Sequence, residues 1–217
     1  MKRLHSLVWM MLLALLALLA LTSTAASAAR GLKFAEEMRG YAYWDGEYRN
    51  ASVSLKITIN DIDKWSVDPN YPATVTGTLF MDRVPAQPIS GTLQILAPAP
   101  NDDGRLLTYR FTSATLQFNG IKHVRDSAGA EVFDDMTTLH GMFQPKGQTP
   151  PSILDLMYQA LWTSELHFEW WDPTTVWNFT MSFQTINTPW YEVLEVEAIF
   201  VVTVFGALAH TLFPWLC

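Results

Sequence analysis

Apolar and polar residues alternate over the middle of the chain, and this pattern predicts β-strands. Near its start, Val53, Leu55 and Ile57 are separated by polar side chains, a period of two that is typical of a strand with one buried face. Gly77 and Gly91 lie inside later strand-like segments, where a glycine indicates a bulge or the close approach of another backbone. The segments rich in β-branched and aromatic residues are 51–59, 73–81, 89–97 and 105–118.

Two short polar segments predict turns between the later strands. Asn119-Gly120 separates the last of those segments from residues 121–125, and an Asn-Gly pair in that position is typical of a two-residue hairpin. Residues 126–130 (DSAGA) predict a second turn, which leads into residues 132–143 (VFDDMTTLHGMF). Runs of this length joined by tight turns indicate an antiparallel sheet.

Helices are predicted toward the C-terminus. A capping-box pattern at Ser152 opens a helix over residues 153–162, and residues 166–170 (LHFEW) predict a strand. Asp172-Pro173 is typical either of a turn or of a helix start with aspartate as the N-cap, and we favour the helix.

Together these elements predict an α+β protein that is mainly β, with an antiparallel sandwich or partial barrel and C-terminal helices. A length of 217 residues accommodates one domain with appendages. The predicted organisation is a signal peptide over residues 1–28, one β-rich domain over 34–187, and an apolar C-terminal helix over 189–216.

The N-terminus has the three parts of a secretory signal peptide. Lys2 and Arg3 form a basic start, residues 7–21 are apolar and uncharged, and residues 26–28 (ASA) supply the small side chains that cleavage needs. Cleavage after Ala28 or Ala29 removes two positive charges and changes the net charge from −7 to about −9. An uncleaved anchor is the alternative, but the apolar core is short for a span of about 20 residues. We therefore expect an exported protein that is periplasmic, envelope-associated or secreted.

The C-terminal end carries a second apolar segment. Thr188-Pro189 predicts a helix start, and residues 198–216 carry no formal charge. Glu192 and Glu195 lie near the predicted helix N-terminus, where acidic side chains are favoured. A helix that is apolar nearly all round docks on its own domain or on a partner, lies on a membrane, or spans it. No basic residue follows the segment, so the positive-inside signal of a spanning helix is missing.

The composition excludes several classes of function. There are 14 lysines and arginines against 21 aspartates and glutamates, and no basic cluster occurs beyond Lys2-Arg3. Nucleic acid is therefore not an expected partner. The one cysteine, Cys217, excludes an intrachain disulfide and cysteine-based zinc sites.

The common catalytic and cofactor motifs are missing from the sequence. There is no G-x-G-x-x-G, no P-loop, no H-E-x-x-H and no G-x-S-x-G. We therefore expect no cofactor, and we favour a non-catalytic role over an enzyme.

One pair of acidic residues is a weak metal candidate. Asp61 and Asp63 offer oxygen ligands to a Ca²⁺ ion, but the full calcium-loop pattern is absent and an ordinary Asx turn is the favoured interpretation. His123 and His167 lie singly in strand-like segments, where a structural histidine is favoured over a metal ligand.

A second cluster is a weak catalytic candidate. Asp134 and Asp135 lie close in sequence to His140, and an Asp–His pair can perform acid–base chemistry. On a strand, Asp134, Met136, Thr138 and His140 would share one face. A polar strand face with hydrogen-bonded threonines is the favoured alternative.

Tryptophan is concentrated in the last third of the chain. Its aromatic body and single polar group suit core packing, a pocket for apolar ligands, or the membrane–water boundary. Core packing is the favoured interpretation, and contact with a lipid-like ligand or a membrane is the functional one. The residues concerned are Trp162, Trp170, Trp171, Trp177, Trp190 and Trp215.

Several short motifs resemble a known family in their order along the chain. They are residues 34–41 (FAEEMRGY), 77–79 (GTL), 91–96 (GTLQIL), 107–111 (LTYRF), 118–122 (FNGIK), 124–128 (VRDSA) and 133–139 (FDDMTTL). The chain resembles the accessory β-rich domain attached to some bacterial cholesterol-oxidase-like flavoproteins of the glucose–methanol–choline (GMC) oxidoreductase family, and to related lipase-like proteins. The resemblance covers about residues 34–143 and implies an association with sterol or lipid metabolism. It does not imply oxidation, because the flavin-binding half is missing.

Three functional hypotheses follow. The favoured one is an exported non-catalytic module that binds lipid or sterol, or a lipid-metabolising partner, in association with a membrane. The second is a separate accessory subunit of a cholesterol-oxidase-like flavoprotein oxidoreductase, which would then be its partner. The third is a small enzyme that uses Asp134 or Asp135 with His140.

Overall fold

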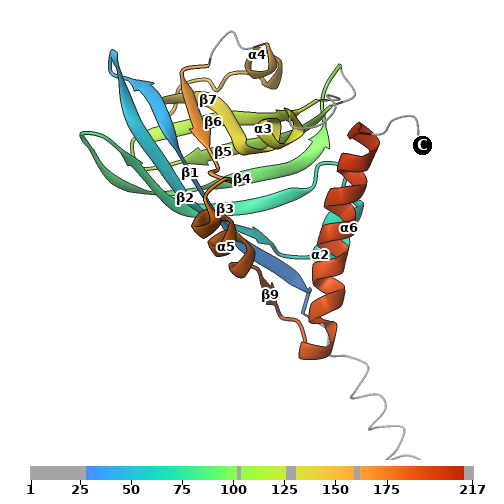
Figure 1. The fold of residues 1–217 in the computed structure, drawn as a ribbon. Coiled ribbons are helices and arrows are strands. Elements are labelled where there is room, and N and C mark those ends of the chain that lie inside the picture. Colours follow the sequence, from blue (N-terminus) through green and yellow to red (C-terminus); the bar gives the residue numbers. More distant parts are fainter. Residues whose placement is uncertain (1–27, 102–103, 126–130, 159–161, 213–217) are drawn as a thin grey trace, which may run out of the picture.

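The computed structural model describes residues 28–101, 104–125, 131–158 and 162–212. It shows a closed antiparallel barrel of eight strands, with one outer strand and a C-terminal helix (Figure 1). The expected mainly β architecture with an antiparallel sheet is confirmed, but the sheet closes instead of forming a sandwich or a partial barrel. The predicted signal peptide, Trp215 and Cys217 lie outside the described residues, apart from Ala28 at the predicted cleavage site.

The strands follow the chain around the barrel, and β1 closes it. One side of β1 pairs with β2, and the other side pairs with β8 and then with the short outer strand β9. The strands are β1 Gly31–Trp44, β2 Glu47–Ile59, β3 Pro72–Met81, β4 Val84–Pro98, β5 Arg105–Thr112, β6 Leu116–Val124, β7 Thr138–Pro145, β8 Ser164–His167 and β9 Gln184–Ile186. The helical elements are α2 Ile62–Val67, α3 Glu131–Thr137, α4 Ile153–Met157, α5 Pro173–Met181, the 3-10 turn η1 Trp190–Glu192, and α6 Val193–Leu212.

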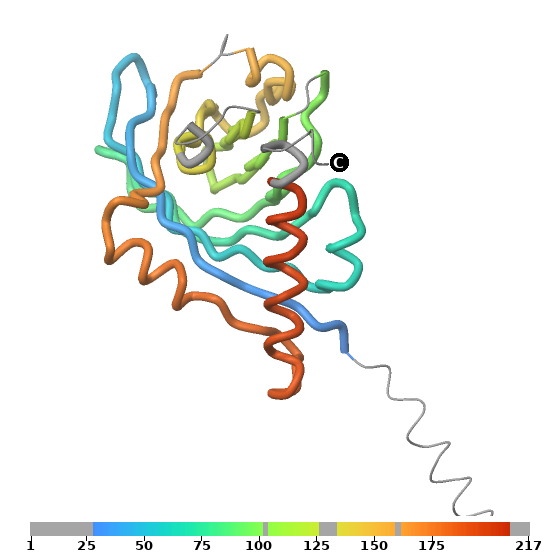
Figure 2. The backbone as a smooth tube through the Cα atoms, turned by 45° about the vertical axis from the view of Figure 1, so that its right-hand side comes forward, coloured from blue at the N-terminus to red at the C-terminus, as the bar shows by residue number. Residues whose placement is uncertain are grey.

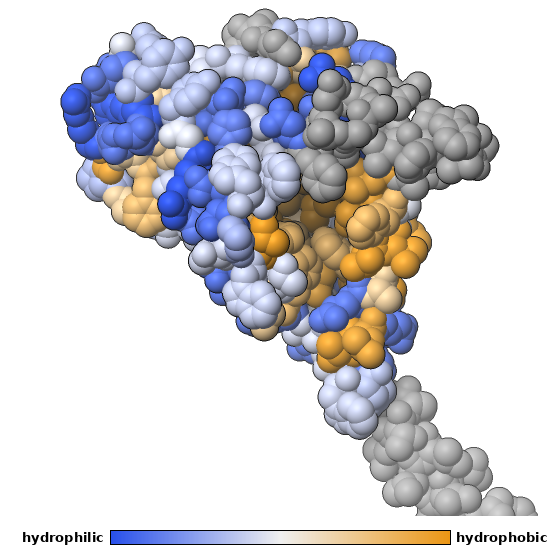
Figure 3. Space-filling view, viewed as in Figure 1, coloured by the Kyte–Doolittle hydropathy of each residue, from blue (hydrophilic) through white to orange (hydrophobic). Residues whose placement is uncertain are grey.

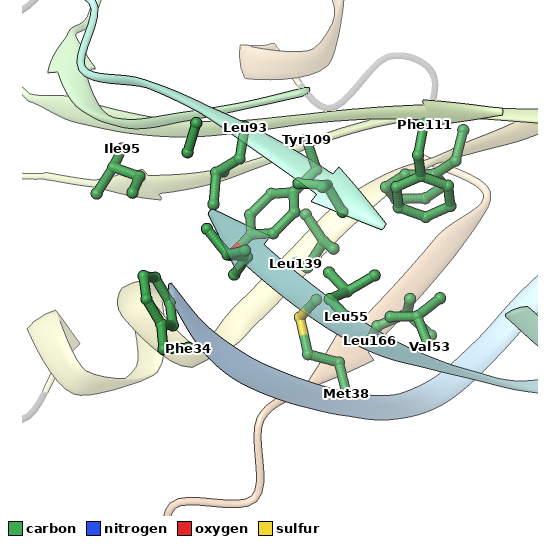
Figure 4. Packing of buried hydrophobic residues seen from close by; sticks show 14 of the residues in the cluster. Phe34, Met38, Val53, Leu55, Leu93, Ile95, Tyr109, Phe111, Leu139 and Leu166 are labelled. Carbon is green, nitrogen blue, oxygen red and sulfur yellow. The ribbon is translucent and has the colours of Figure 1, made fainter. Parts of the chain in front are cut away.

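Alternation of side chains explains how the barrel is filled. On β2 the predicted apolar set Val53, Leu55 and Ile57 points inward and is buried, while the residues between them face outward. Equivalent positions on the other strands complete one continuous core, which Figure 4 shows from close by. These side chains therefore fill the barrel interior.

Two glycines allow neighbouring strands to pack closely. A Cβ atom on Gly91 would lie 1.9 Å from the carbonyl oxygen of Arg110, and one on Gly77 would lie 2.0 Å from that of Ser54. No side chain fits at such distances. The predicted close approach of backbone at both glycines is therefore confirmed.

The hairpin predicted at Asn119-Gly120 is wrong. Both residues lie inside β6, and the chain turns earlier, where the Ser113 side chain accepts from the backbone amides of Thr115 and Leu116. A Cβ on Gly120 would lie 2.5 Å from the ring of Phe118. Glycine is needed here because it makes room for a core phenylalanine, which local turn chemistry does not reveal.

The strand expected over residues 132–143 is only partly correct. Residues 131–137 form helix α3, and β7 begins at Thr138. Asp134 and Met136 therefore do not share a strand face with His140. Thr138 and His140 do, and both point away from the barrel interior, because the intervening Leu139 is buried in the core.

The C-terminal helices differ from the predictions mainly in their boundaries. α4 has the expected capping box between Ser152 and Asp155, but it ends at Met157. α5 begins as favoured, with Asp172 as N-cap. The last helix does not start at Pro189, which has extended backbone angles; a 3-10 turn follows it, and the α-helix begins at Val193. The strand predicted at residues 166–170 is β8, which begins two residues earlier and ends three residues earlier.

One end of the barrel is covered by helices. Of the eight barrel strands, the odd-numbered ones begin at this end and the even-numbered ones finish there. The helices α2, α3 and α6 lie at this end (Figures 1 and 2). Phe200 of α6 lies 5.6 Å from Phe34 of β1 and stacks on the buried Trp65 of α2 at 5.5 Å, both measured between ring centroids. These ring contacts attach α6 to the core.

Candidate functional site

The helix α6 is apolar on both of its faces. Its inner face packs on the barrel through Val196, Phe200 and Leu208. Its outer side carries a stripe of exposed apolar residues, called here the apolar face of α6: Leu194, Ala198, Val201, Val202 and Phe205, with Glu195 and Gly206 exposed beside them. These positions follow the spacing of one helical stripe. A surface helix ordinarily carries polar residues on that side, so this face is unusual.

The side chains of the apolar face are strongly exposed. Leu194 is 79% exposed, Val202 is 69% exposed and Phe205 is 66% exposed. In Figure 3 hydrophobic residues gather over α6, with hydrophilic residues among them toward the start of the helix. Contiguous exposed apolar patches on a protein are typical of sites that bind another apolar surface.

Arg30 holds the N-terminal end of α6 beside the barrel. Its guanidinium lies 2.7 Å from Asp63 of α2, 3.0 Å from Glu192 and 3.1 Å from Glu195. These hydrogen bonds raise the pKa of Arg30, with Asp63 the main cause. The arginine joins the start of β1, α2 and the start of α6 at one point.

Four of the six tryptophans predicted to contact a ligand or a membrane are exposed. Trp190 is 86% exposed on η1, directly before α6, and it makes an edge contact with the exposed Tyr191. Trp170, Trp171 and Trp177 are exposed in and before α5. For these four the favoured expectation of core packing is wrong. Trp162 differs, because its ring stacks on His140 and its Nε1 donates to the Leu156 carbonyl.

Within the described part of the chain, no helix combines the length and apolar character needed to cross a membrane.

The three predicted catalytic candidates do come together, although not on one strand. Asp134 and Asp135 extend from α3, and His140 extends from the outer face of β7. They line a common pocket of about 160 Å³, called here the histidine pocket. Its remaining lining residues are His123, Arg125, Thr138, Met157 and Trp162.

The closest acidic partner of His140 is Glu165 of β8, which sequence reasoning missed. Glu165 Oε2 lies 3.5 Å from His140 Nδ1, and Oε1 lies 2.9 Å from His167 Nε2. The other ring nitrogen of His167, Nδ1, lies 3.2 Å from the hydroxyl of Thr138. Strand register produces this cluster, because His140 pairs with Glu165 and Thr138 pairs with His167.

Burial sets the protonation state of His140. Loss of solvation lowers the pKa of His140, and the nearby Glu165 carboxylate opposes that effect only partly. The imidazole is therefore neutral near pH 7. Burial also raises the pKa of Tyr41, which faces Glu165 from β1.

The predicted metal candidates have structural partners. Asp61 is the N-cap of α2 and accepts from the Lys64 amide, and hydrogen bonding by Lys64 lowers the pKa of Asp61. Asp63 forms an ion pair with Arg30. Among the described residues no group of three or more histidine, cysteine or acidic side chains is arranged to hold a metal ion.

A polar trio inside the barrel was also missed. Lys122 donates to Glu36, and the Tyr109 hydroxyl donates to the same carboxylate at 2.8 Å. All three side chains are buried, and burial raises the pKa of Tyr109 well above its usual value. The sequence of β1 does contain a signal for this trio, because Glu36 is an acidic residue at an inward position between Phe34 and Met38.

Comparison of the chain with protein-family models, with curated proteins and with solved structures finds no match. The resemblance to the accessory domain of GMC flavoproteins therefore stays a prediction. The fold and surface define a filled eight-stranded barrel that carries an exposed apolar helix face and a separate polar pocket.

Proposed function

We propose that the protein attaches to a lipid surface through the apolar face of α6. The observation that carries this proposal is the exposure of Leu194, Val202 and Phe205 on a helix already anchored to the barrel by its other face. Interfacial helices bind membranes by burying such a face at the boundary between headgroups and acyl chains.

The aromatic residues support the same orientation. Trp190 and Tyr191 lie at the start of α6, and their rings are exposed. Tryptophan and tyrosine favour the headgroup region of a membrane because they combine an apolar ring with one polar group. The barrel would then rest on the membrane with its helix-covered end, as a non-catalytic module of an exported protein.

Binding to vesicles tests this function. The protein is floated with phosphatidylcholine vesicles, and tryptophan fluorescence is recorded in parallel. We expect the wild type to bind and its emission to shift to shorter wavelength as exposed indole rings leave water. The double variant Val202→Glu, Phe205→Glu should bind at least tenfold more weakly, because burying one such side chain contributes about 1.5–3 kcal/mol.

A control variant distinguishes vesicle binding through the apolar face of α6 from non-specific binding by any exposed apolar side chain. Phe80 of β3 is also half exposed, and it lies outside α6. The Phe80→Glu variant should bind vesicles like the wild type. Equal loss of binding in Phe80→Glu and the α6 variant would contradict the proposal, as would a wild type that stays unbound.

Two further arms address the narrower hypotheses. Vesicles with and without cholesterol show whether a sterol is required, as the family resemblance implies. If the wild type ignores vesicles but co-purifies from its host with a flavin-bearing polypeptide, the same face belongs to a subunit interface. The accessory-subunit hypothesis would then replace the lipid one.

A further inference from the structure

The imidazole of His140 has a defined orientation. Its Nδ1 lies 3.5 Å from Glu165 Oε2, and its ring stacks on Trp162 with centroids 3.7 Å apart. A carboxylate near one ring nitrogen favours the tautomer that carries the proton on that nitrogen. The opposite nitrogen, Nε2, is then a hydrogen-bond acceptor on the side of the ring away from Glu165.

The neighbouring histidine keeps Glu165 in place. His167 Nε2 donates to Glu165 Oε1 at 2.9 Å, while the Thr138 hydroxyl lies 3.2 Å from His167 Nδ1 and can donate to it. Each oxygen of Glu165 therefore faces one imidazole.

The rest of the histidine pocket is rich in acceptors and negatively charged. Arg125 is the one lysine or arginine among its lining residues, and it is engaged by Asp135, whose carboxylate accepts from the Arg125 backbone amide at 3.1 Å. Asp134 adds a second carboxylate on the same wall. With His140 neutral, the lining carries one net negative charge.

The size and chemistry of the pocket define a class of ligand. A volume of about 160 Å³ is below the roughly 300–1,000 Å³ of pockets that take drug-sized ligands, so only a small ligand fits. An ammonium group donates three hydrogen bonds and accepts none, so it suits a pocket lined by acceptors. We propose that the histidine pocket binds a small primary ammonium ion, which donates to His140 Nε2 and pairs with Asp134. This site is independent of the apolar face of α6 and of the proposed membrane attachment.

Three probes of equal length test the proposal: n-butylammonium, n-butanol and butyrate. Each is titrated into the full chain at neutral pH, with heat of binding and the NMR signals of the His140 ring as readouts. We expect n-butylammonium to bind and to shift the His140 ring signals, and we expect n-butanol and butyrate to do neither. Butyrate binding as tightly as n-butylammonium would overturn the proposal, as would the absence of ammonium binding at about 10 mM.

Variants distinguish binding of n-butylammonium in the histidine pocket from non-specific attraction of the cation to an acidic protein. Asp134→Asn should weaken n-butylammonium binding at least tenfold, and His140→Phe, which keeps a ring beside Trp162, should weaken it several-fold. Asp45→Asn makes the same chemical change in the distant turn between β1 and β2, and should leave binding unchanged. Asp134 is exposed, so its variant keeps the fold. Equal affinities for the Asp134→Asn and Asp45→Asn variants would refute the pocket assignment.

Discussion

Individual residues in the barrel interior combine charge with burial. Lys122 and Glu36 form an ion pair away from solvent, and Tyr109 donates to the same carboxylate. Removing two charges from water is costly, and the pair is tolerated because each member satisfies the other. The trio therefore constrains which side chains occupy this layer of the core.

Removing one charge of the Lys122–Glu36 pair should lower the free energy of unfolding far more than removing both charges. Lys122→Met leaves the Glu36 carboxylate buried without a cation, and we expect a loss of about 3–5 kcal/mol in the free energy of unfolding. The double variant Glu36→Gln, Lys122→Met removes both charges and keeps an acceptor for Tyr109, so its loss should be smaller. Urea denaturation measures both. A single variant within about 1 kcal/mol of the wild type would show that the pair is not coupled.

His140 makes stability depend on pH. Its pKa in the folded protein lies below the value of about 6.5 in the unfolded chain, because burial disfavours the charged ring. The unfolded state therefore binds more protons below pH 6.5, and the stability present above that pH is lost as the pH falls through the folded pKa. Urea denaturation from pH 7.5 to 5 should show this decline, and His140→Phe should reduce its slope. If His140→Phe leaves the pH dependence of the free energy of unfolding unchanged, other titratable groups cause the decline.

Elements with a regular pattern could be predicted from sequence, and elements shaped by distant contacts could not. The period of two over Val53, Leu55 and Ile57 directly reflects a strand with one buried face, and β2 follows this pattern. Asn119-Gly120 has the chemistry of a turn, yet Gly120 serves the packing of Phe118 within β6. Local sequence cannot distinguish these two uses of glycine.

The candidate site shows the same limit of local reasoning. Asp134, Asp135 and His140 are close in sequence, and the structure also brings them together. Glu165 reaches His140 only through the pairing of β7 with β8, after an intervening helix. A contact created by strand register has no local signal. The exposed face of α6 also has no local signal. The helix is apolar nearly all round, so only its packing on the barrel shows which side stays exposed.

At the scale of the whole molecule, an apolar face is set in an acidic protein. The chain carries a net charge of −7. Beside the start of α6, Arg30 is already paired with Asp63, Glu192 and Glu195, so this region offers no spare positive charge from that arginine. If the protein attaches to membranes through α6, the attraction is hydrophobic and the long-range electrostatic contribution is unfavourable on anionic lipid.

This balance predicts a lipid preference opposite to that of polybasic segments, which are attracted to anionic lipid. At low salt, phosphatidylglycerol added to phosphatidylcholine vesicles should weaken binding, because the anionic surface repels an acidic protein. Raising the salt concentration shortens the screening length from about 10 Å at 0.1 M to about 3 Å at 1 M, so the difference between the two vesicle types should shrink while hydrophobic binding persists. Flotation across both lipid mixtures and a salt series measures this. Stronger binding to phosphatidylglycerol that disappears with salt would instead place the contact on a cationic surface, and α6 would no longer explain it.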